Sequence, residues 1–239
     1  MSEHMLPGDP PVQLVLRRSA RARRYSLRVS RLDGRVTLTM PRTASPARAL
    51  NFAQEKAAWI RARLAERPDE IRAEFGAVLP VGGVEMRVVE AARSRLNFSQ
   101  ARIEVSDRVN AAPPVVAGLL KAHARDRLVA AADRYSGALG RPYSRITIRD
   151  TRSRWGSCSA QGALMFSWRL VLAPPQVLDY VAAHEVAHLA EMNHGPRFWA
   201  AVARLRPGYA PERDWLRAHG EALHRYRFTA AAIDGDGAT

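Results

Sequence analysis

The sequence predicts an α+β protein with a β-rich N-terminal part and a C-terminal part built around one helix. Three observations lead to this prediction. Short runs of alternating apolar and polar residues recur through residues 12–106, as in half-buried strands. Residues 115–137 form a long run with leucines suited to helix packing. In the stretch 174–199, His184 and His188 lie one helical turn apart, so both side chains project from one helix face.

The N-terminal part begins with residues 1–11, which we expect to be a disordered lead. Asp33-Gly34 predicts a hairpin turn, and Val81-Gly82-Gly83 predicts a second turn. A helix is expected to begin with Ser45 as N-cap and Pro46 in its first turn, and to end near Arg67-Pro68. The strands expected here are residues 12–18, 25–30, 36–40, 84–90 and 101–106.

Residues 110–114 interrupt the pattern and are the predicted boundary between an N-terminal β-rich subdomain, 12–112, and a second domain, 113–228, which contains the two histidines. Residues 229–239 are expected to form a loose tail. Within the second domain, Gln161-Gly162 joins two strands, and the second strand leads directly into the histidine helix that opens at Pro174-Pro175. The expected elements are helix 115–137, strands 145–149, 154–159 and 164–172, a helix from Pro196 and a last helix over 211–226.

The pattern His184-Glu185-x-x-His188 is typical of zinc hydrolases. Zinc takes about four ligands, and a catalytic site keeps one position for water. Two histidines four residues apart supply half of that shell, and Glu185 can accept a proton from the water. His194 follows at a turn marked by Asn193 and Gly195, which could bring it back as the third ligand. The alternative is that the pattern is a chance match and the histidines are buried structural residues. The prolines, the apolar helix residues and the third histidine argue against this alternative.

The charge of the chain is +14, and only Lys56 and Lys121 of its 37 basic residues are lysines. Seven arginines fall between residues 17 and 31 with no acidic residue among them. We expect this segment to give weak, sequence-independent nucleic-acid binding, against the alternative of a solvated basic face. The residues assigned to this contact are Arg17, Arg18, Arg21, Arg23 and Arg24.

Several features bear on the compartment. Cys158 is the single cysteine, so no intramolecular disulfide can form and a reducing compartment is expected. The N-terminus has no apolar core typical of a signal peptide. No run of about 18 apolar residues is present, so we expect no membrane span. These features predict a cytoplasmic protein of 239 residues, long enough for one large domain or two small ones.

The motifs of the C-terminal half, taken together, are more specific than the histidine pattern alone. Residues 154–159 read R-W-G-S-C-S, residues 168–170 read W-R-L, and A-P-P at 173–175 precedes the histidine helix. With Asn193-His194, this series resembles the YgjP-like metallopeptidase family, and the likeness extends over most of residues 12–228. The segment from His194 to Phe198 is also similar to the third-ligand segment of SprT-like proteases. The histidine spacing equals the metzincin pattern, but Glu191 stands where that family needs glycine.

The resemblance implies a zincin-like catalytic domain with His184, His188 and His194 as Zn²⁺ ligands and Glu185 as the catalytic base. It implies a protein or peptide substrate. Two alternatives remain: a zinc amide hydrolase acting on a small or cell-wall substrate, and a nucleic-acid-binding module whose zinc site is not catalytic. Cleavage assays on unfolded protein distinguish a peptidase from the first alternative. Salt-dependent DNA binding by a Glu185 variant would favour the second alternative.

The strand 154–159 precedes the hairpin partner that enters the histidine helix, so we expect it to form the rim of the site. Trp155, Gly156 and Ser157 are the predicted substrate-binding residues, through backbone pairing with an extended peptide. A proline at Ser157 is expected to remove that pairing. The alternative is that Trp155 is a core residue with no role in substrate binding.

Other side chains leave choices open. Cys158 is either a zinc ligand or a buried thiol that only packs in the core. The packing role is favoured. His219 and His224 lie five residues apart, on different helix faces, which argues against a second metal site. The residues that could stabilise an oxyanion are Arg169, Arg197, Tyr209 and Tyr226.

Overall fold

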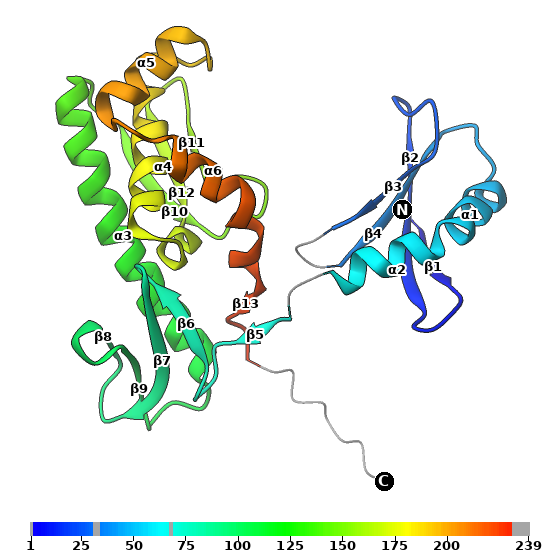
Figure 1. The fold of residues 1–239 in the computed structure, drawn as a ribbon, viewed down its shortest axis with the longest axis horizontal. Coiled ribbons are helices and arrows are strands. Elements are labelled where there is room, and N and C mark those ends of the chain that lie inside the picture. The colour runs from blue at the N-terminus through cyan, green and yellow to red at the C-terminus, as the bar shows by residue number, and fades with distance from the viewer. Residues whose placement is uncertain (1, 31–33, 67–68, 231–239) are drawn as a thin grey trace. The chain divides into compact units, whose positions relative to one another are not determined.

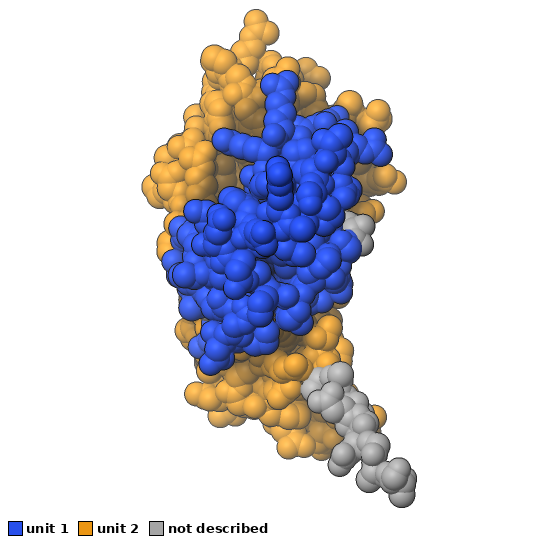
Figure 2. All heavy atoms as spheres, turned by 90° about the vertical axis from the view of Figure 1, so that its right-hand side faces the viewer, with its two compact units in different colours: residues 1–69 blue, residues 70–239 orange. Residues whose placement is uncertain are grey.

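The computed structural model describes residues 2–30, 34–66 and 69–230, and the chain divides into two compact units (Figures 1 and 2). Unit 1 comprises residues 1–69 and unit 2 comprises residues 70–239. Both units combine β-sheets with α-helices, which confirms the predicted α+β class. Each unit also has its own cluster of buried apolar residues.

Unit 1 is a four-stranded sheet packed with two helices. The strand order is β1-β2-β4-β3, with β2 parallel to β4 and the other pairs antiparallel. Alternate residues of β4 are buried, and they pack with Ala53 and Ile60 of the helices. The elements are β1 (Ser2–Leu6), β2 (Val12–Ser19), β3 (Ser26–Val29), β4 (Val36–Pro41), α1 (Pro46–Glu55) and α2 (Ala57–Ala65).

Two expectations for this unit are wrong. The supposed disordered lead contains β1, which pairs with β2 and buries Leu6, so an edge strand replaces a free end. The single helix expected up to Arg67-Pro68 is two helices, because the backbone at Lys56 leaves the helical region (φ −96°, ψ 8°). Ser45 precedes α1 as predicted, but its side chain makes no capping hydrogen bond. Asp33 of the expected hairpin turn lies outside the described residues, although β3 and β4 pair antiparallel around it.

Unit 2 begins with a second four-stranded sheet, in the order β6-β7-β9-β8. Gly82 and Gly83 both have positive φ, +57° and +84°, so the predicted turn between β6 and β7 needs glycine at both positions. The sheet comprises β6 (Val78–Val81), β7 (Val84–Ala91), β8 (Arg95–Asn97) and β9 (Arg102–Ser106). A short parallel pair, β5 (Ile71–Arg72) with β13 (Tyr226–Arg227), joins the two ends of the unit.

The rest of unit 2 packs a three-stranded sheet and a long helix around the histidine helix. α3 and α4 lie side by side (Figure 1), and β11 packs against α4. The sheet order is β10-β12-β11, with β11 at the edge. The elements are α3 (Ala112–Leu139), β10 (Arg145–Arg149), β11 (Gly156–Cys158), β12 (Ala163–Ser167), α4 (Pro175–Ala187), α5 (Pro196–Leu205) and α6 (Ala210–His219), with 3-10 helices η1 (Phe98–Gln100), η2 (Trp168–Leu172) and η3 (Gly220–Arg225).

The predicted boundary at residues 110–114 differs from the structure, whose units divide between Asp69 and Glu70. Strands β6, β7 and β9, which precede residue 112, share one buried cluster with the helices after it. Met86 and Ile103 belong to the same core as Leu120 of α3 and Val181 of α4. Proline in the first turn of α3 therefore marks a helix start and not a linker.

The C-terminal elements also end differently from the prediction. The last helix stops at His219, and a 3-10 turn replaces its expected second half. Residues 231–239 of the expected tail lie outside the described residues. Within the described part of the chain, none of the helices combines the length and apolar character that crossing a bilayer requires.

Candidate metal centre

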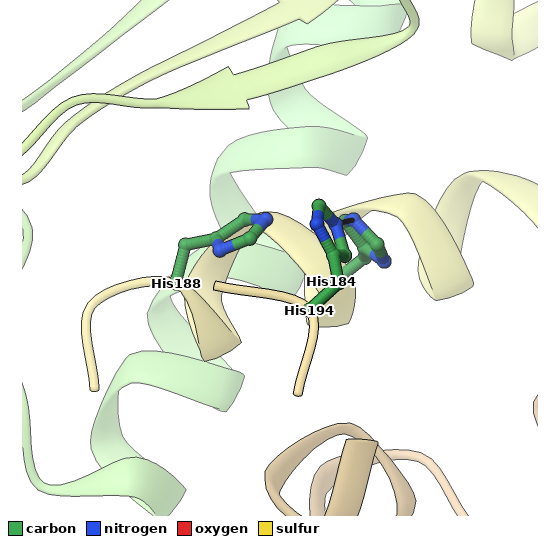
Figure 3. Close-up of side chains that lie close together, drawn as sticks. All are labelled: His184, His188 and His194. Carbon is green, nitrogen blue, oxygen red and sulfur yellow. Dashed lines mark hydrogen bonds between the residues drawn. The ribbon is translucent and has the colours of Figure 1, made fainter. Parts of the chain in front are cut away.

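Helix α4 places two histidines at its C-terminal end. The helix begins at Pro175 and ends at Ala187, and His188 is the residue that follows, still in helical conformation (φ −63°, ψ −19°). The helix ends well before the turn that Asn193 and Gly195 predict. The chain turns after His188, and His194 comes back beside the two helix histidines (Figure 3).

The three imidazoles form a compact group. One ring nitrogen of each lies within 4.8 Å of the others, and the Nε2 atoms of His184 and His194 are 3.1 Å apart. Two ligands of a tetrahedral zinc ion at about 2.0–2.1 Å stand roughly 3.3 Å apart, so this donor set fits zinc. Nδ1–H of His188 donates to the Glu191 carbonyl at 3.0 Å, because a carbonyl can only accept. That bond leaves the His188 Nε2 lone pair available to a metal.

Burial keeps the helix histidines neutral. It lowers the pKa of His184 to about 3, with His188 and His194 adding to the effect. Burial likewise lowers the pKa of His188. Metals bind the neutral imidazole, so at neutral pH both residues are in the ligand form.

Glu185 is buried beside the group, with 6% of its surface exposed. Burial raises the pKa of this carboxyl to about 8, and the charge of Arg154 acts in the opposite direction. Gly156 of β11 lies directly over it: a Cβ added to Gly156 would stand 2.5 Å from Cγ and 2.6 Å from Oε1 of Glu185. Glycine is therefore the residue that lets the strand and the carboxyl approach so closely.

A cleft of about 270 Å³ brings these groups together. Gly156, Ser157 and Cys158 of β11 line one side, and the histidines with Glu185 line the other. β11 thus has the rim position expected for residues 154–159. The part that Gly156 and Ser157 play in substrate binding stays a prediction.

A second hollow of about 470 Å³ adjoins His184 and His194 on the side of α6. Trp155 lines it and also contacts Gly220 and the ring of His224, so this side chain is half-buried and faces the hollow. Tyr180 lies one turn before His184, a spacing that could have identified it from the sequence. Arg213 comes from α6, and no local pattern indicates its position.

Arg169 and Cys158 are two candidates that the described structure does not include in the three-histidine group. Arg169 is buried, pairs with Asp150 at 2.7 Å and donates to the carbonyls of Leu223 and Tyr226, so it holds the C-terminal segment. Burial raises the pKa of the Cys158 thiol to about 11, with the charge of Glu185 adding to it. In the described residues, Cys158 is not part of the three-histidine group.

Two other histidines stand apart from the group. His219 stacks on Trp215 and makes a hydrogen bond with its carbonyl. His224 is buried beside Trp155, and burial lowers its pKa to about 4. Neither belongs to a metal-binding group within the described residues.

Comparison with known proteins shows similarity to a protein family and to a solved structure. The family model described as YgjP-like, metallopeptidase domain, matches residues 23–219. A search among curated proteins finds no match. The crystal structure of the metallopeptidase zymogen of Pyrococcus abyssi abylysin is similar at 19% identity and a TM-score of 0.35, covering 39% of this chain and 93% of that one.

Proposed function

Because the chain belongs to the YgjP-like metallopeptidase family, we propose that it is a zinc-dependent peptidase acting on protein or peptide substrates. His184, His188 and His194 hold the ion, and Glu185 is the general base. One observation supports this assignment most strongly: three imidazole donors and a buried carboxyl meet in a single cleft. The residues present thus fit the metal that the family implies.

Zinc bound by the three imidazoles would polarise the scissile carbonyl and lower the pKa of the attacking water. Glu185 takes the proton that this water loses, because its carboxylate lies in the same cleft. Burial favours the protonated carboxyl, so Glu185 can hold the proton and then give it to the departing amine nitrogen. The helix histidines keep their donors fixed on α4, while the His188–Glu191 bond orients one ring.

A cleavage screen on denatured proteins tests this function. The zinc-loaded chain should cleave them with or without DNA, and a chelator should stop the reaction. If the chain leaves denatured proteins intact but hydrolyses small or cell-wall amides, the result would instead indicate the alternative amide hydrolase.

The free edge of β11 supports backbone pairing with substrate. Ser159 N–H donates to Ala163 at 3.0 Å and Ser167 N–H donates to Trp155 at 2.8 Å. An antiparallel ladder repeats every two residues, so Ser157, opposite Met165, also directs its N–H toward β12. The expected test with proline at Ser157 is therefore wrong, because it would break pairing inside the sheet.

Gly156 and Cys158 are the residues whose N–H and C=O groups point to the free edge. We expect Cys158→Pro to lower kcat/KM for peptides about tenfold, since one edge donor is lost. Cys158→Ser keeps the donor and is the matched control. Zinc content and thermal unfolding establish that both variants are folded. Equal kcat/KM in the two folded variants would argue against backbone pairing.

The charge of unit 1 favours a second activity, weak nucleic-acid binding. Residues 1–69 contain fourteen Arg or Lys and six Asp or Glu, a net charge of +8. The arginines assigned to this contact are exposed at the end of β2 and in the segment before β3. Phosphate contacts of this kind do not depend on base sequence.

Replacing Arg17, Arg18, Arg21, Arg23 and Arg24 by Gln should weaken DNA retention and flatten its salt dependence. Each lost phosphate contact removes about 0.9 from the slope of log K against log salt. The control changes five exposed arginines of unit 2 to Gln, namely Arg108, Arg125, Arg141, Arg145 and Arg204. Retention and slope that match the control variant would eliminate this surface.

A further inference from the structure

The 470 Å³ hollow beside His184 and His194 has a composition that the proposed chemistry does not use. Its walls are aromatic or apolar, and two arginines of α6, Arg213 and Arg217, complete it. We call it the arginine pocket. The pocket shares His184 and His194 with the metal centre. A substrate side chain or terminus bound in it would therefore lie close to the peptide bond that is cut.

A stack of rings fixes one wall of the arginine pocket. The Tyr180 and Tyr209 rings are 5.9 Å apart and within 7° of parallel, and Tyr209 and Trp199 are 5.5 Å apart and within 12°. The guanidinium carbon of Arg213 lies 5.5 Å from the Trp199 ring centre and 5.7 Å from that of Tyr209. Contact with aromatic faces orients the guanidinium without using its hydrogen-bond donors.

The donors of Arg213 are poorly used within the part of the chain that the structure describes. Its Nε is buried without a hydrogen bond, and its ion contact to Asp214 Oδ1 is long, 3.5 Å. Arg217 approaches the same oxygen at 3.6 Å. Asp214 is 63% exposed, so both pairs are weak. No acidic residue of the described chain lines the pocket, which leaves it positive.

We propose that the arginine pocket binds a carboxylate of the peptide substrate beside the scissile bond, which rests on the proposed peptidase function. Two sources share this chemistry: an Asp or Glu side chain, and the free C-terminus of the substrate. Guanidinium and carboxylate form paired, charge-assisted hydrogen bonds. An aromatic substrate residue could stack on the same wall, but it would give the Arg213 donors no partner beyond the long contact with Asp214.

The test uses peptides that carry Glu, Gln or Phe at each position near the scissile bond, with a free or amidated C-terminus. We expect kcat/KM to be about tenfold higher for Glu than for Gln at one position, as for a hydrogen bond between charged groups. A preference that instead follows the free C-terminus assigns the pocket to that carboxylate. Equal rates for Glu and Gln at every position, with no effect of amidation, would overturn the proposal. A preference for Phe would overturn it as well.

Variants connect the preference to the pocket. Arg213→Gln should bring the ratio of the Glu to the Gln rate close to one, and Arg217→Gln, at a 70% exposed side chain, should lower it part of the way. Arg204→Gln makes the same charge change on an exposed position outside the pocket and should keep the full ratio. A full ratio in both pocket variants would contradict the assignment.

A binding measurement separates the two proposals. Trp155 and Trp199 line the pocket, so tryptophan fluorescence can follow peptide binding to the zinc-loaded Glu185→Gln variant. Tighter binding of the Glu peptide without cleavage by the wild-type chain would retain the pocket and reject the peptidase. Cleavage without any Glu preference in rate or binding would retain the peptidase and reject the pocket.

Discussion

Glu185→Gln should abolish most peptide cleavage while the chain keeps its zinc. The amide has the size and shape of the carboxyl, so it fits under Gly156, but it cannot accept a proton. General-base assistance contributes typically about 10²–10⁴-fold, so kcat should fall by that factor. The loss corresponds to roughly 3–5 kcal/mol of activation free energy at 1.36 kcal/mol per decade. Zinc content and cleavage of one denatured substrate are measured on the same preparation.

The metal-free protein supplies an independent control. The pKa of Glu185 is raised in the folded chain, so its contribution to stability is complete at low pH and is lost as pH rises from about 4.3 toward 8. The Gln variant lacks this loss and should unfold at a higher temperature than wild type near pH 8.

In the cleavage experiment, a Gln variant that binds zinc and cleaves at the wild-type rate would exclude Glu185 as the base.

His194→Ala should weaken zinc binding more than any change outside the three-histidine group. Partners that only orient a ligand account for about 10–100-fold in metal affinity, and loss of a ligand should exceed the upper figure. His194 is exposed and follows the end of α4, so the fold should tolerate the change. Competition with a chromogenic chelator measures the affinity.

His219→Ala is the matched control for that experiment. It removes an exposed imidazole that stacks on Trp215 and is not part of the group. Its zinc affinity should equal that of wild type. If His194→Ala also binds zinc as tightly as wild type, the third ligand is another residue.

Local sequence patterns were sufficient to predict the features that depend on a single short segment of the chain. The spacing of His184 and His188 requires only a helix, and the Gly82-Gly83 turn requires only two residues with positive φ. Residues 164–172 show the limit of such patterns. Their continuous apolar run was expected to be one strand, yet η2 begins at Trp168, because a fully buried run has no diagnostic period.

Long-range packing decided the rest. The register between β11 and β12 decides whether the backbone N–H of Ser157 or those of its neighbours point to the free edge. The sequence of β11 alone does not encode that register. Arg213 reaches the Trp199 ring, which lies on α5, from a different helix, α6. The boundary was misplaced because Met86 and Leu120 share a core across it, a contact that composition does not indicate.

The separate cores of the two units have a thermodynamic consequence. Buried residues of unit 1 and unit 2 form distinct clusters, so each unit should unfold as its own cooperative transition in calorimetry. Zinc binds residues of unit 2 alone under the proposed function. At a free concentration 100 times the dissociation constant it should stabilise that unit by about 2.7 kcal/mol. The other transition, that of the basic unit, should stay at the same temperature, and DNA should shift it instead.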